Sequence, residues 1–133
     1  MNPNYTLVAN RANHRCEYCR APEIIFNFSF EVEHIRPVSR QGAETLDNLA
    51  LACRSCNLHK GNRISGIDPN TGTEIRLFHP RLDEWENHFQ ANITFGTIIA
   101  LTEIGAGTVD CLEMNSHSQI MARQFWISLG LFP

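Results

Sequence analysis

Apolar and polar residues alternate most regularly between Ile24 and His34, in the segment IIFNFSFEVEH. A period of two, with aromatic and β-branched residues at every second position, is typical of a β-strand that buries one face. This alternation puts Val32 on the buried face and Glu33 on the polar face. His34 continues the apolar parity, so we expect a twist or a strand end nearby to bring Glu33 and His34 to one site.

A loop, a second strand and a helix are predicted after this first strand. Residues 36–45 contain Pro37 and Gly42 and show no sustained periodicity, which is typical of a loop. The leucines between 46 and 51 predict a second short strand, and residues 57–63 predict a short helix. The expected order is therefore strand, loop, strand, helix.

The flanking segments carry further signals. Residues 5–15 predict a short helix or turn, and residues 68–72 (DPNTG) predict a turn. Apolar residues three and four apart predict two more helices, over residues 82–89 and 116–129. Between them, residues 93–101 predict a hairpin that turns at Gly96.

Length and composition favour one compact unit. The chain has 133 residues, of which 43% are hydrophobic and 19% charged, which is enough to bury one core. We predict an α+β fold with a core over residues 1–66 and a small mixed α/β C-terminal extension, over residues 67–133, packed on it. No apolar run approaches the ~18 residues of a membrane-spanning helix, so we expect a cytoplasmic protein without a membrane partner. The sequence leaves the oligomeric state open.

The charge distribution limits how the chain can bind nucleic acid. A formal net charge of −3 and a pI near 6.0 argue against a protein that holds nucleic acid by a broad basic coat. Eight of the eleven cationic residues nevertheless lie in the first 63 positions, at Arg11, Arg15, Arg20, Arg36, Arg40, Arg54, Lys60 and Arg63. We therefore expect any phosphate-binding surface on the N-terminal half and none across the C-terminal half.

The cysteines form two C-x-x-C pairs and one remainder. Cys16 and Cys19 are separated from Cys53 and Cys56 by 33 residues, a pattern that predicts a closed four-cysteine zinc site. A redox role needs one pair in a thioredoxin-like context, which is absent here. Such a zinc site has no open coordination position, so its predicted role is structural. Cys111 is expected to be a small buried apolar residue.

Polar residues follow in a fixed order between and after the cysteine pairs. The segments read Glu33-His34-Ile35-Arg36-Pro37, then Gly42, then Asp47-Asn48-Leu49, and, after the last paired cysteine, Asn57-Leu58-His59-Lys60. Each element taken singly is common on protein surfaces. Together with the cysteine pairs, this order resembles the HNH endonuclease family over residues 11–63, in the four-cysteine, zinc-knuckle variant found in stand-alone bacterial HNH proteins.

The resemblance implies a ββα-metal HNH core, in which two antiparallel strands and a helix hold one divalent cation. His34 takes the place of the general base, and Asn48 that of the residue that fixes the loop and so the orientation of His34. Glu33 and Asn57 take the places of the cation ligands. Gly61 stands where many members have a third ligand, so water and a substrate phosphate are expected to complete the coordination.

The same residue types suit phosphodiester hydrolysis on chemical grounds. Histidine is the side chain that ordinarily titrates near neutrality, so it suits removal of a proton from water. Oxygen ligands such as Glu33 and Asn57 favour Mg²⁺ or Mn²⁺, whereas thiolates favour zinc. Arg36, Lys60 and Arg63 lie close enough in the sequence to contact flanking phosphates, with a solvated charged face as the alternative for each.

The predicted function is a metal-dependent endonuclease that hydrolyses phosphodiester bonds in DNA. Two other functions compete with it: a zinc-stapled module that binds nucleic acid without cleavage, and a structural adaptor. The joint presence of Glu33, His34, Asn48 and Asn57 favours the enzyme, because a binding module has no need of a base beside a carboxylate. The histidines far from this segment, His14, His79, His88 and His117, are expected to be structural or exposed. His59 lies two residues after Asn57 and is kept as a minor alternative for the site.

Overall fold

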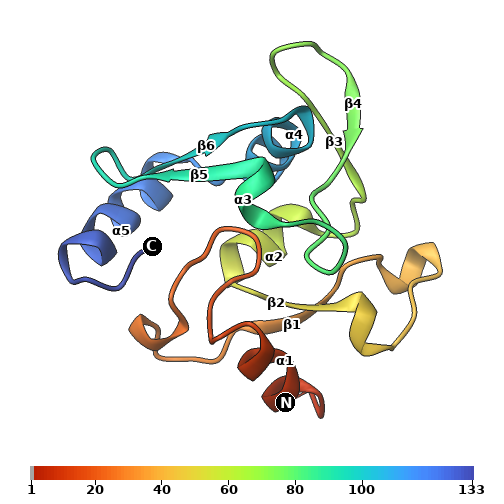
Figure 1. The fold of residues 1–133 in the computed structure, drawn as a ribbon. Helices are drawn as coiled ribbons and strands as arrows, with labels where there is room; N and C mark the ends of the chain where they lie inside the picture. The colour runs from red at the N-terminus through yellow and green to blue at the C-terminus, as the bar shows by residue number, and fades with distance from the viewer. Residues whose placement is uncertain (1) are drawn as a thin grey trace.

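The computed structural model describes residues 2–133 as an α+β fold with three separate two-stranded antiparallel sheets. The first sheet pairs β1 (Glu31–His34) with β2 (Leu49–Ala52), and α2 (Arg54–Lys60) packs against both strands. The predicted strand, loop, strand, helix order is therefore confirmed. In Figure 1, β1, β2 and α1 (Tyr5–Arg11) lie in the lower half of the molecule, below α2.

The first strand is shorter than predicted, and its faces are reversed. The predicted strand segment begins instead with a 3-10 helix, η1 (Glu23–Ile25), and pairing starts only at Glu31. Glu33 is 5% exposed whereas Val32 is only half-buried, so the assignment of Glu33 to the polar face is wrong. The burial is tolerated because the Glu33 carboxylate meets Tyr18 and Lys60 inside the protein.

The loop between β1 and β2 is confirmed, and two short 3-10 helices lie within it. These are η2 (Val38–Arg40) and η3 (Leu46–Asn48), so β2 is shorter than the leucine pattern predicts. Helix α2 begins earlier than predicted, because the sulfur of Cys53 accepts a hydrogen bond from the backbone N–H of Cys56 and so caps the helix.

After α2, the described residues form two hairpins and three further helices. The hairpins are β3 (Ser65–Ile67) with β4 (Glu74–Arg76) and β5 (Phe89–Asn92) with β6 (Thr97–Ala100). The helices are α3 (Trp85–His88), α4 (Glu103–Cys111) and α5 (His117–Ser128). The predicted turn at 68–72, the turn at Gly96 and the C-terminal helix are confirmed, whereas the helix predicted over 82–89 is the single turn of α3.

Helix α4 is not predicted by the sequence, because EIGAGTVDC contains two glycines, which disfavour helix formation. The glycines permit close packing instead. A Cβ at Gly105 would lie 2.2 Å from the carbonyl oxygen of His88, and a Cβ at Gly107 would lie 2.4 Å from the Ile75 side chain. The hydroxyl of Thr102 caps the helix by accepting a hydrogen bond from the Gly105 N–H. Tertiary packing therefore overrides a weak local preference.

Buried aromatic rings join the extension to the core. Trp85 Nε1 donates a 2.8 Å hydrogen bond to the carbonyl oxygen of Tyr18, and the ring of Phe78 lies 6.4 Å from that of Tyr18. Further along, the ring of Trp126 in α5 lies 5.9 Å from that of Phe26. These residues belong to one hydrophobic cluster together with the strands of the core.

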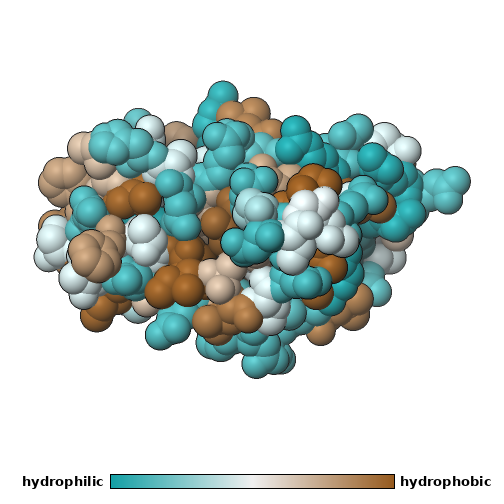
Figure 2. Space-filling view, turned by 90° about the horizontal axis from the view of Figure 1, so that it is seen from above, coloured by the Kyte–Doolittle hydropathy of each residue, from teal (hydrophilic) through white to brown (hydrophobic). Residues whose placement is uncertain are grey.

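The outer face of the extension is mixed in polarity. Figure 2 shows hydrophilic and hydrophobic side chains interspersed over the face seen from above. Among residues 2–133, no helix has the length and apolar character needed to span a membrane. The predicted boundary between residues 66 and 67 falls inside β3, and the division into two parts stays a prediction.

Candidate active site and metal centre

Four cysteines from two distant turns meet inside the core. Cys16 and Cys19 follow α1, while Cys53 and Cys56 lie at the start of α2. Their sulfur atoms lie within 4.8 Å of one another, and all four residues are buried. Zn–S bonds of about 2.3 Å in a tetrahedron place the sulfurs about 3.8 Å apart. The sulfurs of Cys19 and Cys53 are 3.7 Å apart, so the donor set and its spacing fit the predicted zinc ion.

The local backbone and the crowding of the sulfurs both favour a bound cation. The backbone N–H of Cys19 points at the sulfur of Cys16 at 3.5 Å, and the N–H of Cys56 at that of Cys53 at 3.4 Å. Hydrogen bonds from Cys16 and the other thiols lower the pKa of Cys19, whereas hydrogen bonding to Cys16 and its neighbours raises the pKa of Cys53 and of Cys56. A divalent cation would end this competition, because all four sulfurs could then bind it as thiolates.

His34 ends β1, and its imidazole is partly exposed. Its Nε2 lies 2.7 Å from Oε1 of Glu44, which is in the loop between the two strands. An ionised carboxylate only accepts hydrogen bonds, so Nε2 is the donor in this contact, and in the neutral ring Nδ1 then has the lone pair. In a general base of this kind, a carboxylate orients the imidazole through one ring nitrogen while the other accepts the proton.

Asn48 fixes the backbone just after His34. Its Oδ1 accepts a 2.9 Å hydrogen bond from the N–H of Arg36, and its Nδ2 donates to the carbonyl oxygens of Arg36 and Ala43 at 3.0 and 2.8 Å. Gly42 permits this crossing, because a Cβ there would lie 1.7 Å from the Arg36 carbonyl oxygen. The geometry is what a loop-holding residue requires, while the effect of Asn48 on catalysis stays a prediction.

Glu33 lies inside the protein and is paired there. The hydroxyl of Tyr18 donates to its Oε1 at 2.5 Å, and Nζ of Lys60 donates to its Oε2 at 2.7 Å. Burial raises the pKa of Glu33, against the lowering effect of Lys60 and Tyr18. Lys60 is 1% exposed. The predictions that Glu33 binds a cation and that Lys60 binds a phosphate both assume open side chains, and the structure pairs these two residues with each other instead.

Lys60 also holds the end of β1. Its Nζ donates to the carbonyl oxygen of Ile35 at 2.8 Å and to that of His34 at 3.4 Å. Lys60 and Asn48 therefore fix consecutive parts of the segment that sets the direction of His34. Asn57 lies one turn before Lys60 on α2 and is half-buried, and its predicted role as a cation ligand stays a prediction.

Arg36 and Arg63 are both exposed, but their surroundings differ. The Nε of Arg36 donates to a loop carbonyl oxygen at 2.8 Å, and no carboxylate of the described residues forms an ion pair with it. Nη1 of Arg63 lies 3.5 Å from the sulfur of Cys111, and Glu74 and Asp110 line the same shallow cleft. Acidic neighbours oppose a phosphate, so Arg36 is the better placed of the two.

Two residues of the site escape sequence reasoning. Glu44 lies in an irregular loop, where nothing in the local pattern separates it from a solvated acid. Tyr18 lies between two zinc-ligand cysteines, and no periodicity indicates that its hydroxyl reaches Glu33, 15 residues further along the chain. Only the folded backbone brings these partners together.

The family comparison agrees with this geometry. The HNH endonuclease family model matches residues 16–63, a range that spans both cysteine pairs, His34 and Asn48. No curated protein and no solved structure matches the chain. The match ends before the extension, so it says nothing of residues 67–133. Residues 16–63 of this chain therefore match the HNH endonuclease family, and their buried four-cysteine cluster is consistent with its zinc-knuckle variant.

Proposed function

We propose that this chain is a metal-dependent endonuclease that hydrolyses phosphodiester bonds in DNA, with His34 as the general base. The observation that carries the proposal is the pairing of His34 with Glu44 at the end of β1, inside the segment that matches the HNH family. The family match over residues 16–63 supports a nuclease-type activity. The DNA substrate, the catalytic cation and the roles of single residues are our proposals.

The proton transfer follows from the orientation of the imidazole. Nδ1 of His34 takes a proton from a water molecule as the water oxygen attacks phosphorus, and the bond from phosphorus to the leaving oxygen breaks. Glu44 accepts the hydrogen bond from Nε2 and stabilises the imidazolium that forms. A positioned base of this kind typically contributes ~10²–10⁴ to the rate.

A hard divalent cation, Mg²⁺ or Mn²⁺, would offset the charge that develops on the phosphate and the leaving oxygen. Asn57 and Glu33 are the ligands that the family resemblance predicts. Apart from the cysteine cluster, no three His, Cys, Asp or Glu side chains of residues 2–133 lie close enough to share an ion. Water and substrate oxygens must then complete the coordination, as is common for Mg²⁺. Glu33 can take part only if its carboxylate leaves Lys60.

The second candidate is a zinc-stapled module that binds nucleic acid without cutting it. The observation in its favour is that both oxygens of the Glu33 carboxylate have partners within the protein, Tyr18 and Lys60. A binding module needs no free carboxylate at this place. The two candidates therefore differ in whether a divalent cation other than zinc changes what the protein does to DNA.

Incubation of the purified protein with supercoiled plasmid separates the two candidates. We expect nicked or linear product with Mg²⁺ or Mn²⁺ and none with EDTA. Zinc content is measured after the EDTA treatment, because loss of the structural ion would also stop the reaction. A gel shift of the plasmid without product in any metal would favour the binding module and contradict the nuclease.

A further inference from the structure

A cleft of about 290 Å³ lies where the core meets the extension. The core side consists of Ile35, Arg36, Lys60 and Ile64, and the extension side of β4 and the segment after it, with Arg76, His79 and Leu82. No carboxylate is among the described residues that line this cleft. Ile35 and Arg36 directly follow His34, so the cleft adjoins the proposed catalytic base.

His79 lines this cleft, and its ring carries a hydrogen-bond donor. Its Nδ1 accepts hydrogen bonds from the backbone N–H groups of Arg81 and Leu82 at 3.2 and 3.3 Å. The ring proton therefore resides on Nε2. Burial lowers the pKa of His79, with smaller effects from nearby charges, so the ring stays neutral at neutral pH and keeps this orientation.

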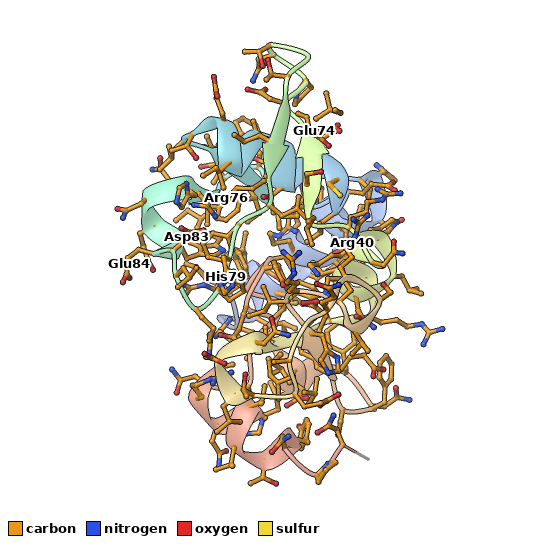
Figure 3. All side chains as sticks on the ribbon, turned by 90° about the vertical axis from the view of Figure 1, so that its right-hand side faces the viewer. Arg40, Glu74, Arg76, His79, Asp83 and Glu84 are labelled. Carbon is orange, nitrogen blue, oxygen red and sulfur yellow. The ribbon has the colours of Figure 1, made fainter. Side chains whose placement is uncertain are left out.

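The arginines on the two sides of the cleft are held in different ways. Arg36 donates its Nε to the carbonyl oxygen of Arg40 at 2.8 Å, which orients its guanidinium without neutralising the charge. Arg40 in turn donates its Nε to the carbonyl oxygen of Asn62 at 2.7 Å. Arg76 forms a two-pronged ion pair with Asp83 at 2.7 and 2.9 Å, which fixes the far wall. Figure 3 shows Arg76, Asp83 and His79 grouped together on the extension.

We infer that this cleft binds one nucleotide unit of the DNA strand next to the bond that is cut. Its phosphate contacts the guanidinium of Arg36 and the Nε2–H of His79, and its sugar and base lie against the exposed side chain of Leu82. The inference rests on the proposed function and assigns the extension a part in it. It also revises the expectation that the C-terminal half does not contact phosphates.

The geometry of the cleft suits a phosphate better than other anions. The oriented guanidinium offers two N–H groups in one plane, which suits two phosphate oxygens. A neutral N–H donor beside it adds a contact without a second cation, and the apolar walls suit a sugar and a base rather than a free ion. A single nucleotide unit is therefore a better match than inorganic phosphate.

Binding measurements test the cleft without cleavage. A His34→Ala protein, which keeps the cleft, is titrated against a fluorescein-labelled DNA duplex in Mg²⁺, alone or with His79→Ala or Arg36→Gln. We expect each second change to weaken affinity about tenfold, and Arg36→Gln to reduce the slope of log affinity against log salt by about 1. His117→Ala, an exposed change outside the cleft, is the control and should leave affinity unchanged.

A single neutral phosphate analogue locates the contact. A set of duplexes carries one methylphosphonate each, at successive positions along the strand. At one position, next to the cut, the analogue should weaken binding of the His34→Ala protein. The same analogue should cause no further loss of affinity in the protein that also carries Arg36→Gln. His79→Gln, which retains an N–H donor, should recover part of the loss caused by His79→Ala. The inference would be wrong if His79→Ala and His117→Ala bound DNA equally well. It would also be wrong if every methylphosphonate weakened binding equally with and without Arg36→Gln.

The outcomes separate this inference from the proposed function. If the cleft variants weaken DNA binding as expected but the wild-type protein never cuts plasmid, the cleft binds DNA and the proposed nuclease activity is wrong. If the wild-type protein cuts plasmid with Mg²⁺ but the cleft variants bind DNA as well as the control, the nuclease activity holds and the role of the cleft is wrong. Absence of DNA binding by the His34→Ala protein would overturn the cleft, and wild-type cleavage would then be judged on its own.

Discussion

The core contains two polar sites that are built in opposite ways. In the cysteine cluster, four buried sulfurs face one another, and backbone N–H groups of the same turns point at two of them. In the site around His34, the partly exposed imidazole pairs with Glu44, whose side chain is 68% exposed. The first site has ligands on every side, and the second is open to solvent on one side.

This difference separates stability from chemistry. A closed set of thiolates binds zinc with free energy that is available only to the folded chain, so it stabilises the fold and leaves no position for a substrate. An open site held by hydrogen bonds to loop carbonyls adds little stability, and in the proposed mechanism it leaves Nδ1 of His34 accessible to water. Changes in the first site should unfold the protein, while changes in the second should lower the rate of DNA cleavage.

The largest effect is expected from Cys16→Ser. A four-cysteine zinc site contributes on the order of 10 kcal/mol in small domains, comparable with the whole stability of a domain. We expect the variant to lose zinc and unfold its N-terminal half, as seen by metal analysis and circular dichroism. Cys111→Ser is the matched control, because Cys111 is also buried but lies outside the cluster, and it should be mild. Wild-type protein purified without chelator and found free of zinc would contradict this account.

The next effect is expected from Lys60→Met, which leaves the buried Glu33 carboxylate without its cation. Removing one partner of a buried ion pair typically costs about 3–5 kcal/mol, which urea unfolding should detect. The double variant Glu33→Gln with Lys60→Met should recover much of this loss, because no charge is then buried. If Lys60→Met is as stable as wild type, the pair is not buried as described, and Glu33 again becomes available to a catalytic cation.

A smaller effect is expected from Glu23→Gln, in a region that belongs to neither site. Burial alone would raise the pKa of Glu23, but hydrogen bonds from the N–H of Phe30, from His14 and from Tyr5 outweigh it and lower the pKa. A carboxyl with a lowered folded pKa stabilises the fold fully above the unfolded value of ~4.3, and this contribution is lost as the pH falls through the folded value.

Stability curves measured against pH test this assignment. We expect Glu23→Gln to cost about 1–3 kcal/mol at pH 7 and to approach wild type below the folded pKa of the carboxyl. Glu86→Gln serves as a control, since its side chain is 70% exposed and pairs with Arg20 at the surface. A constant difference between wild type and Glu23→Gln across the acid range would show that the titration is misassigned.

The smallest effect on stability is expected from Asn48→Ala. Its hydrogen bonds lie in an exposed loop, so their loss should cost only about 1 kcal/mol. The cleavage rate should nevertheless fall on the order of tenfold or more, because the backbone after His34 is no longer fixed. Single-turnover cleavage and urea unfolding are measured on the same preparation, with the exposed Asn70→Ala as control. Equal losses of stability and rate would make Asn48 a merely structural residue.

The sequence predicts the parts of the core that depend on spacing. Two C-x-x-C pairs can satisfy a tetrahedral ion only by meeting, so the cysteine cluster follows from the pattern alone. The order of strand, loop, strand and helix also follows, because Pro37 and Gly42 interrupt regular structure through local backbone effects. The structure confirms the order of these elements and brings the four sulfurs together.

Features that depend on distant partners could not be predicted. The alternation around Val32 puts Glu33 on the polar face, and only the meeting of Glu33 with Tyr18 and Lys60 explains its burial. Helix α4 forms because its glycines fit against other segments, which local preference cannot indicate. Glu44 reaches His34 from an irregular stretch of the loop, between its two 3-10 helices. Each of these outcomes is decided by tertiary contacts rather than by local pattern.

The most direct measurement is the single-turnover rate of plasmid cleavage by His34→Ala and by wild type, with saturating Mg²⁺ and matched zinc content. Because His34 acts only in the transition state, we predict that the rate falls by ~10²–10⁴ while DNA affinity and the unfolding curve stay close to wild type. No increase in Mg²⁺ should recover the activity, since a metal ion does not replace a missing base. Cleavage by His34→Ala at the wild-type rate, in a preparation free of contaminating nuclease, would contradict the central claim.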